Sequence, residues 1–133
     1  MREFHLQIVT PDGEIFSGMA LAVRVRCEGG DIEIMAGHAD LFASLGIGEA
    51  RLKIGERDRF ASAAGGFISV RGGEVKIIAT TFEFAEDIDI GRAKAAKEKA
   101  EERLRLAKDE RAHKLAMAKL ARALNRISVK ERL

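Results

Sequence analysis

The residues with the most chemical potential lie at two places that a folded-back chain could bring together. Ile88-Asp89-Ile90-Gly91-Arg92-Ala93 offers a carboxylate and a guanidinium about one helical turn apart. Arg122 and Arg126 are spaced to share one face of a later helix. If the two helices are antiparallel, these groups border one cleft, where they suit an adenine amino group and a polyphosphate. Helix capping by Asp89 and ordinary surface charge explain the same residues without a ligand.

No other part of the sequence favours catalysis or metal binding. The three histidines are widely separated, Cys27 is the only cysteine, and neither HExxH nor CxxC spacing occurs. The glycine pair Gly65-Gly66 is followed by neither Lys-Ser/Thr nor a helix start, so a hairpin turn is expected there rather than a phosphate loop. The sequence therefore predicts a non-enzymatic protein that requires no cofactor.

One histidine deserves consideration as a contact residue. Gly37-His38 lies in a glycine-containing loop segment, Ala36 to Asp40, and a loop histidine can bind a partner protein. A plain surface histidine is the simpler interpretation of the same residues. Gly37 and His38 are therefore candidate partner-binding residues.

Charge is divided unevenly along the chain. Residues 1–85 carry 9 Lys/Arg and 12 Asp/Glu, whereas residues 86–133 carry 14 and 9, and within residues 111–133 the ratio is 7 to 1. The last segment should therefore seek an acidic surface or a nucleotide. A nucleic-acid-binding adaptor remains a remote alternative, because the chain has no Tyr or Trp on which bases could stack.

The elements that must position these residues fall into two regions. Phe4, Leu6 and Ile8 alternate with polar residues and precede the turn sequence Thr10-Pro11-Asp12-Gly13. Short apolar stretches separated by glycine-containing turns follow, which is typical of an antiparallel sandwich or barrel. The stretches are 21–27, 32–35, 50–54, 59–64, 67–70 and 75–80.

Helical periodicity begins near Asp87, with Asp87 and Asp89 available to cap and charge the first turn. A narrow alanine-rich stripe runs through residues 93–107, and a second apolar stripe runs through 112–127. Only Lys108-Asp109-Glu110-Arg111 suggests a break, so a hairpin and a single long helix both remain open. The fold class is α+β, with a sandwich over 1–85 and a helical region over 86–133.

Several short sequences, in this order, resemble one family, the epsilon subunits of bacterial F-type ATP synthases. They are Val9-Thr10-Pro11-Asp12-Gly13, Gly37-His38-Ala39, Gly65-Gly66-Phe67, Ala85-Glu86-Asp87-Ile88-Asp89 and Asn125-Arg126-Ile127-Ser128-Val129. The resemblance implies a β-sandwich of about ten strands followed by a two-helix hairpin. It also implies a non-catalytic subunit of the rotating central stalk.

The resemblance further implies partners and a location. The sandwich is expected to dock on the gamma subunit and the ring of c subunits, with Gly37 and His38 near the ring. The basic second helix, including Arg111 and Lys119, is expected to meet acidic segments of the catalytic head, formed by alpha and beta subunits, and to block ATP hydrolysis. The protein would then lie at the cytoplasmic face of the bacterial membrane without inserting into it.

Some members of this family bind ATP through an Ile-Asp-x-x-Arg-Ala motif, which stands here as Ile88, Asp89, Arg92 and Ala93. By the same resemblance, the remaining candidate contacts are Glu83, Lys114, Arg122 and Arg126. Lys114 stands where such members carry an arginine, and a lysine offers a point charge instead of a planar fork. The alternative within the family is a purely structural coupling subunit whose nucleotide motif is vestigial.

Overall fold

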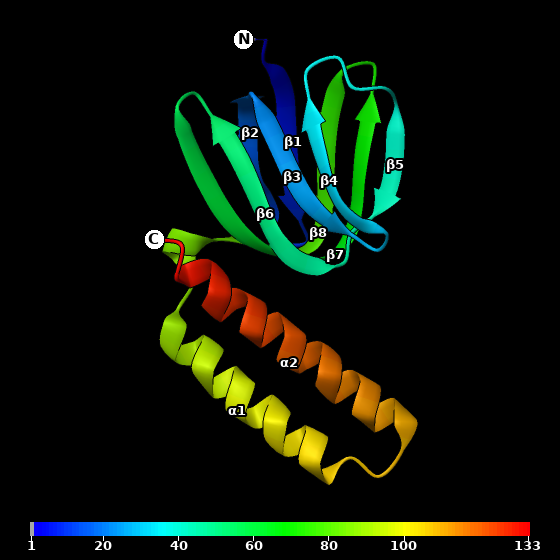
Figure 1. The fold of residues 1–133 in the computed structure, drawn as a ribbon, viewed down its shortest axis with the longest axis vertical. Helices are drawn as coiled ribbons and strands as arrows, with labels where there is room; N and C mark the ends of the chain where they lie inside the picture. Colours follow the sequence, from blue (N-terminus) through cyan, green and yellow to red (C-terminus); the bar gives the residue numbers. More distant parts are fainter. Residues whose placement is uncertain (1) are drawn as a thin grey trace.

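The strands come first in this computed structural model, which describes residues 2–133, and the helices follow (Figure 1). Within these residues there are eight strands, one 3-10 turn and two α-helices. Their bounds are β1 Phe4–Thr10, β2 Gly13–Ala20, β3 Ala22–Cys27, β4 Gly30–Met35, β5 Leu41–Ser44, β6 Ile47–Ile54, β7 Arg57–Arg71, β8 Glu74–Phe84, η1 Ala85–Asp87, α1 Ile90–Leu106 and α2 Glu110–Lys130.

The strands form two layers that share β7 and β8. One layer has the pairing order β2-β1-β8-β7-β5, and the other continues from β8 and β7 through β6 and β3 to β4. The pairs are antiparallel except β1 with β8, which is parallel. The expected sandwich is confirmed. The strand count is eight instead of about ten, because β7 and β8 each pass through both layers without interruption.

The hairpin turn expected at Gly65-Gly66 is not formed, because β7 continues through both glycines and changes layer there, with φ angles of +72° and +100°. Residues 57–64 pair with β6, whereas residues 67–70 pair with β5. A Cβ atom at Gly66 would overlap the carbonyl oxygen of Ile78 and lie 2.8 Å from the Ala79 Cα. Only glycine combines this φ with so close a backbone approach.

The core lies between the two layers, where alternate residues of each strand point inward. Leu6, Ile8, Val23, Leu52 and Ile77 are fully buried there. The single cysteine, Cys27, belongs to this core, and burial together with the nearby Asp31 carboxylate raises the pKa of its thiol. The thiol is therefore a packing group held in its neutral form.

The helices form a hairpin, which decides between the two arrangements that the sequence left open. Asp89 caps α1 by accepting a hydrogen bond from the Arg92 backbone N–H at 3.1 Å, and Asp109 caps α2 through the Ala112 N–H at 2.7 Å. Buried alanines let the two helices pack closely. Figure 1 shows α2 between the sandwich and α1. None of the helices in residues 2–133 combines the length and the apolar character that crossing a bilayer requires.

Candidate functional site

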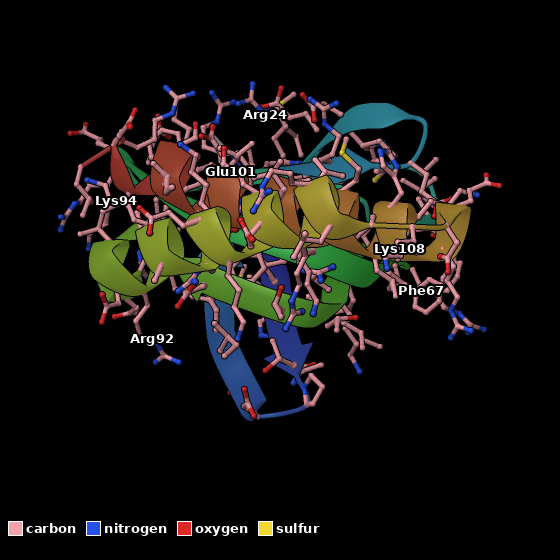
Figure 2. The ribbon with its side chains drawn as sticks, turned by 90° about the horizontal axis from the view of Figure 1, so that it is seen from below. Arg24, Phe67, Arg92, Lys94, Glu101 and Lys108 are labelled. Atoms are coloured by element: carbon pink, nitrogen blue, oxygen red, sulfur yellow. The ribbon has the colours of Figure 1, made fainter. Side chains whose placement is uncertain are left out.

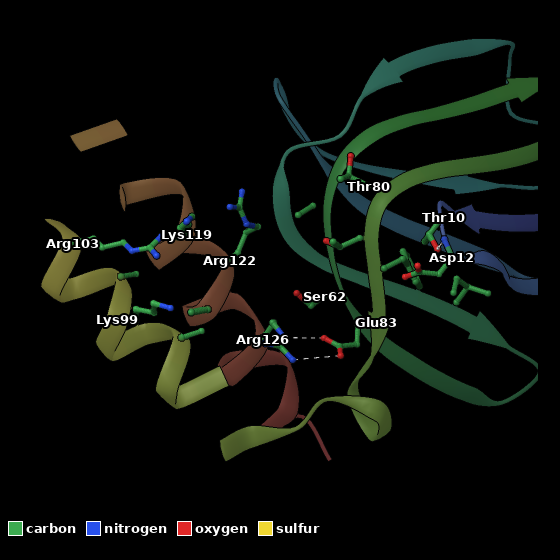
Figure 3. A pocket seen from close by; sticks show the side chains of 17 residues that line it. Thr10, Asp12, Ser62, Thr80, Glu83, Lys99, Arg103, Lys119, Arg122 and Arg126 are labelled. Carbon is green, nitrogen blue, oxygen red and sulfur yellow. Dashed lines mark hydrogen bonds and ion pairs between the residues drawn. The ribbon is translucent and has the colours of Figure 1, made fainter. Parts of the chain in front are cut away.

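A cleft of about 550 Å³ lies between one end of the sandwich and the helical hairpin (Figure 3). We call it the sandwich–hairpin cleft. Its helical wall is basic, and its sandwich wall carries hydroxyl and carboxylate groups. The polar residues that line it are Thr10, Asp12, Ser62, Thr80, Thr81, Glu83, Lys99, Arg103, Lys119, Arg122 and Arg126.

Helical spacing explains the basic wall. Lys99 and Arg103 are four residues apart on α1, and Arg122 and Arg126 are four residues apart on α2, so each pair shares one helix face. Alanines stand beside them at the cleft, and their short side chains leave room for a ligand. Figure 3 shows long basic side chains from both helices at the same opening.

One of the five basic residues is already neutralised. Arg126 donates to Glu83 of β8 through Nε at 2.8 Å and through Nη2 at 3.4 Å. Among residues 2–133, no ion pair within 4 Å is recorded for the other four, which are Lys99, Arg103, Lys119 and Arg122. The cleft therefore holds an excess of positive charge that suits a multiply charged anion.

The junction motif predicted to bind nucleotide lies beside this cleft and does not line it. Ile88 and Ala93 are buried in packing contacts, and the Asp89 carboxylate is engaged in the cap of α1. Arg92 precedes Ala96 and Lys99 by four and seven residues, so it lies on the α1 face that continues into the cleft. Figure 2 shows its side chain projecting outward near the start of α1. The predicted constellation is thus only partly assembled.

The remaining predicted residues are dispersed. Lys114 forms an exposed ion pair with Glu110 at 3.3 Å on α2, away from the cleft, and Arg111 lies exposed in the first turn of that helix. Lys119, predicted to bind a partner, lines the cleft instead. Gly37 and His38 occupy the β4–β5 loop at the opposite end of the sandwich from the helices (Figure 1). His38 Nδ1 donates to the Ala39 carbonyl oxygen at 2.7 Å.

Lys99 and Arg103 are the basic cleft residues that sequence reasoning missed, and it also missed the sandwich residues Thr10, Asp12, Ser62, Thr80 and Thr81. Lys99 and Arg103 continue the helical spacing that begins at Arg92, and that periodicity alone would have placed them beside the motif. Over residues 2–133, no group of three or more His, Cys, Asp or Glu residues is arranged to hold a metal ion. The site is therefore suited to binding an anion by positive charge.

Comparison with known proteins accounts for both halves of the chain. Residues 3–85 match the family model described as the β-sandwich domain of the ATP synthase delta/epsilon chain, and residues 86–131 match its long α-helix domain. A Halalkalibacterium halodurans protein named ATP synthase epsilon chain is 41% identical over 97% of this chain and 98% of its own length. A Bacillus velezensis protein of the same name is 42% identical with the same coverages.

Solved structures share the fold. A chain of the Euglena gracilis mitochondrial ATP synthase, in a structure of its OSCP, F1 and c-ring, superposes with a TM-score of 0.78 at 23% identity. That match covers 90% of this chain and 76% of the other. A chain from the central stalk and c-ring of the Tetrahymena thermophila mitochondrial ATP synthase gives a TM-score of 0.60 at 12% identity, over 98% and 96% of the two chains.

Proposed function

Because the chain belongs to the ATP synthase delta/epsilon family, we propose that its sandwich couples it to the rotating stalk and that its helices restrain ATP hydrolysis under the control of bound ATP. It is an epsilon subunit of the F-type enzyme and a non-catalytic part of the central stalk. Catalysis lies in other subunits of the complex.

The observation that carries the nucleotide proposal is the uncompensated positive charge in the sandwich–hairpin cleft. Four basic side chains without carboxylate partners border a cleft of about 550 Å³, and small-molecule sites commonly occupy about 300–1,000 Å³. Arginine forks bind phosphate oxygens in pairs, and lysines add point charge. A triphosphate supplies the several negative charges that this wall lacks.

We propose that ATP lies along the basic face of α1. Arg92 belongs to the junction motif and begins this face, so the adenine would lie toward the start of α1 and the phosphates toward Lys99, Arg103 and Arg122. Lys114 lies outside this row and is paired with Glu110, so it is not part of the proposed ATP site. Glu83 enters the site through its ion pair with Arg126.

A ligand that binds only the folded hairpin shifts the equilibrium toward it by RT ln(1 + [L]/Kd), which is about 2.7 kcal/mol at a hundredfold excess over Kd. Abundant ATP would thereby keep the basic α2 away from the catalytic head. Scarce ATP would release α2, so that Arg111 and Lys119 could reach acidic segments of the catalytic head.

Calorimetric titration of the intact chain with ATP tests the site. We expect saturable binding, a loss of affinity of at least about tenfold in Arg122→Ala, and abolished binding in Asp89→Ala with Arg92→Ala. Lys114→Ala is the matched control, because it removes one positive charge from α2 outside the cleft. Absence of binding to the wild-type chain would leave a structural coupling subunit with a vestigial motif.

A second surface supports docking of the sandwich on the stalk. Phe42 and Phe67 stack with their ring centroids 5.1 Å apart, although their exposed fractions are 68% and 44%. Ile78, the register partner of Phe67 on β8, is 48% exposed. We call Phe42, Phe67 and Ile78 the aromatic patch. Contiguous exposed apolar groups of this kind mark protein interfaces, and the gamma subunit is the proposed partner.

Co-purification of the chain with its gamma subunit tests the aromatic patch. Phe42→Ser with Phe67→Ser should abolish retention of the chain by the gamma subunit. Met19→Ser, which changes an exposed apolar residue on β2 outside the patch, should leave retention intact. Equal retention of all three proteins would exclude the patch.

The proposed c-ring contact at Gly37 and His38 lies at the far end of the sandwich from the hairpin, which leaves the helices free to face the catalytic head. We propose that the subunit lies at the cytoplasmic face of the membrane as part of the ATP synthase.

A further inference from the structure

The end of α2 makes a set of contacts with the sandwich that the cleft and its proposed ligand do not explain. The hairpin meets β6, β7 and η1 through α2, and α1 packs on α2 (Figure 1). Many of these contacts come from the last turns of α2 and from Arg132, two residues after the helix ends. Asn125, Val129, Lys130 and Arg132 supply them, and none of the four lines the cleft.

Asn125 joins α2 to two strands at once. Its side-chain amide donates to the Gly48 carbonyl oxygen of β6 and to the Ser62 hydroxyl of β7, each at 2.9 Å. Ser62 is 7% exposed, so its hydroxyl has little access to water. When α2 moves away, the amide and the hydroxyl exchange these protein partners for water, so each hydrogen bond contributes its net free energy to the closed state.

Lys130 and Val129 hold the linker that leads into α1. Lys130 Nζ donates to the carbonyl oxygens of Ala85 and Glu86 at 3.0 and 3.4 Å, so it completes the hydrogen bonding of η1. Val129 is fully buried with Ala85 and Ile88 in a small apolar cluster against Phe60. The end of α2 is therefore attached both to the sandwich and to residues 85–88, the linker about which the helices would turn.

Arg132 adds a two-point ion pair beyond the end of α2. Its Nε and Nη2 atoms donate to the two carboxylate oxygens of Glu49 at 2.9 and 3.2 Å. The guanidinium also lies 5.1 Å from the Phe60 ring centroid. Bidentate geometry constrains orientation as well as distance, so this pair ties the C-terminal residues after α2 to β6.

From these contacts we propose that Asn125, Val129, Lys130 and Arg132 form a C-terminal latch, which closes the hairpin on the sandwich without a ligand and must open before the helices can leave. The latch sets the closed fraction of the ligand-free chain. A ligand on the basic wall of the cleft multiplies that fraction by a further factor, because none of the four latch residues lines the cleft. The latch consequently exists whether or not the cleft binds ATP.

Spin-label distances in the intact, nucleotide-free chain test the latch. Cys27→Ala removes the native thiol, and labels are placed at Arg71 on β7 and Lys108 at the hairpin tip, both exposed. The variant Asn125→Ala with Lys130→Ala should raise the ratio of open to closed molecules about tenfold. Lys114→Ala removes the same charge from the same helix without touching the sandwich, and should match the parent chain.

Two further measurements complete the test. Backbone amide spectra of β1–β8 report that the sandwich stays folded, and the milder Arg132→Gln variant should give a smaller opening in the same direction if the double variant unfolds. Equal distance distributions for the double variant and Lys114→Ala would overturn the latch. Adding ATP separates the two ideas, because failure to reclose the opened variant counts against ATP binding and leaves the latch standing.

Discussion

At the scale of single residues, Arg59 of β7 binds Glu86 of η1, which in turn contacts the latch residue Lys130. Its guanidinium donates to one Glu86 carboxylate oxygen at 2.8 and 3.2 Å and lies 3.7 Å from the centroid of the Phe84 ring. The hydrogen bond from Arg59 is the main reason that the pKa of the Glu86 carboxyl is lowered. Lys130 binds the backbone carbonyl oxygen of Glu86, so the ionised Glu86 side chain lies in the surface on which α2 docks.

The Glu86 shift predicts a pH-dependent contribution to stability. A carboxyl whose pKa is lower in the folded protein stabilises it above the unfolded pKa, and this stabilisation disappears as pH falls through the folded value. The difference in unfolding free energy between wild type and Glu86→Gln should therefore shrink as pH falls from about 5 to about 3. Urea unfolding at a series of pH values measures it.

Glu56→Gln is the control for this prediction. Glu56 is exposed in the β6–β7 turn and, within residues 2–133, has no recorded ion pair or side-chain hydrogen bond. Its difference from wild type should not change over the same pH interval. A difference for Glu86→Gln that stays constant with pH would show that the pair with Arg59 does not contribute to folding.

At the scale of elements, the bend in β7 makes a sandwich from eight strands. Gly66 combines a φ of +100° with an approach to the Ile78 carbonyl that leaves no room for a Cβ atom. We expect Gly66→Ala to lower the unfolding free energy by about 3 kcal/mol, since strain at the positive φ adds to displacement of β8. Thermal or urea unfolding monitored by circular dichroism measures this loss.

Gly72→Ala separates the two costs at Gly66. Gly72 lies in the β7–β8 turn with a φ of +55°, and a Cβ atom there meets nothing within 4 Å. Its substitution should cost only the backbone term, about 1 kcal/mol. If both variants lose the same stability, the contact with β8 has no energetic role in the bend.

At the scale of the whole molecule, the two halves are held together mainly by polar contacts, whereas the sandwich is held by its apolar core. Arg126–Glu83 and Arg132–Glu49 are ion pairs between α2 and the strands. Such partly exposed pairs weaken as salt shortens the Debye length from about 10 Å at 0.1 M to about 3 Å at 1 M. The docking of the hairpin and the stability of the sandwich should therefore respond differently to salt.

We predict that raising sodium chloride from about 0.1 M to about 1 M increases the ratio of open to closed molecules roughly threefold in the spin-labelled chain. The unfolding midpoint of the sandwich should not fall over this range. Arg132→Gln should show a weaker salt response, because one of the two pairs is already missing. A salt-independent distance distribution in the wild-type labelled chain would contradict the electrostatic part of the docking.

How far the fold can be predicted from sequence depends on the strength of the local pattern. Alternation predicted β1, an apolar stretch bounded by a glycine-containing turn predicted β3, and the spacing of apolar residues predicted both helices. β2 and β5 were missed, because β2 contains Gly13, Ser17 and Gly18, and β5 is only four residues long. Asp89 was recognised as a potential cap, and its engagement with the Arg92 N–H confirms that role.

The sequence by itself determined the order of strands and helices, the concentration of positive charge in the last segment and the membership of the family, because these follow from local pattern and residue type. Only the tertiary structure decided that the helices form a hairpin, that α2 and not α1 lies on the sandwich, and that Glu83 neutralises Arg126 while Lys99 and Arg103 enter the cleft. No glycine or proline lies between Arg92 and the C-terminus. The direction of the chain there depends on contacts between residues far apart in sequence, such as Asn125 with Gly48, which no local pattern encodes.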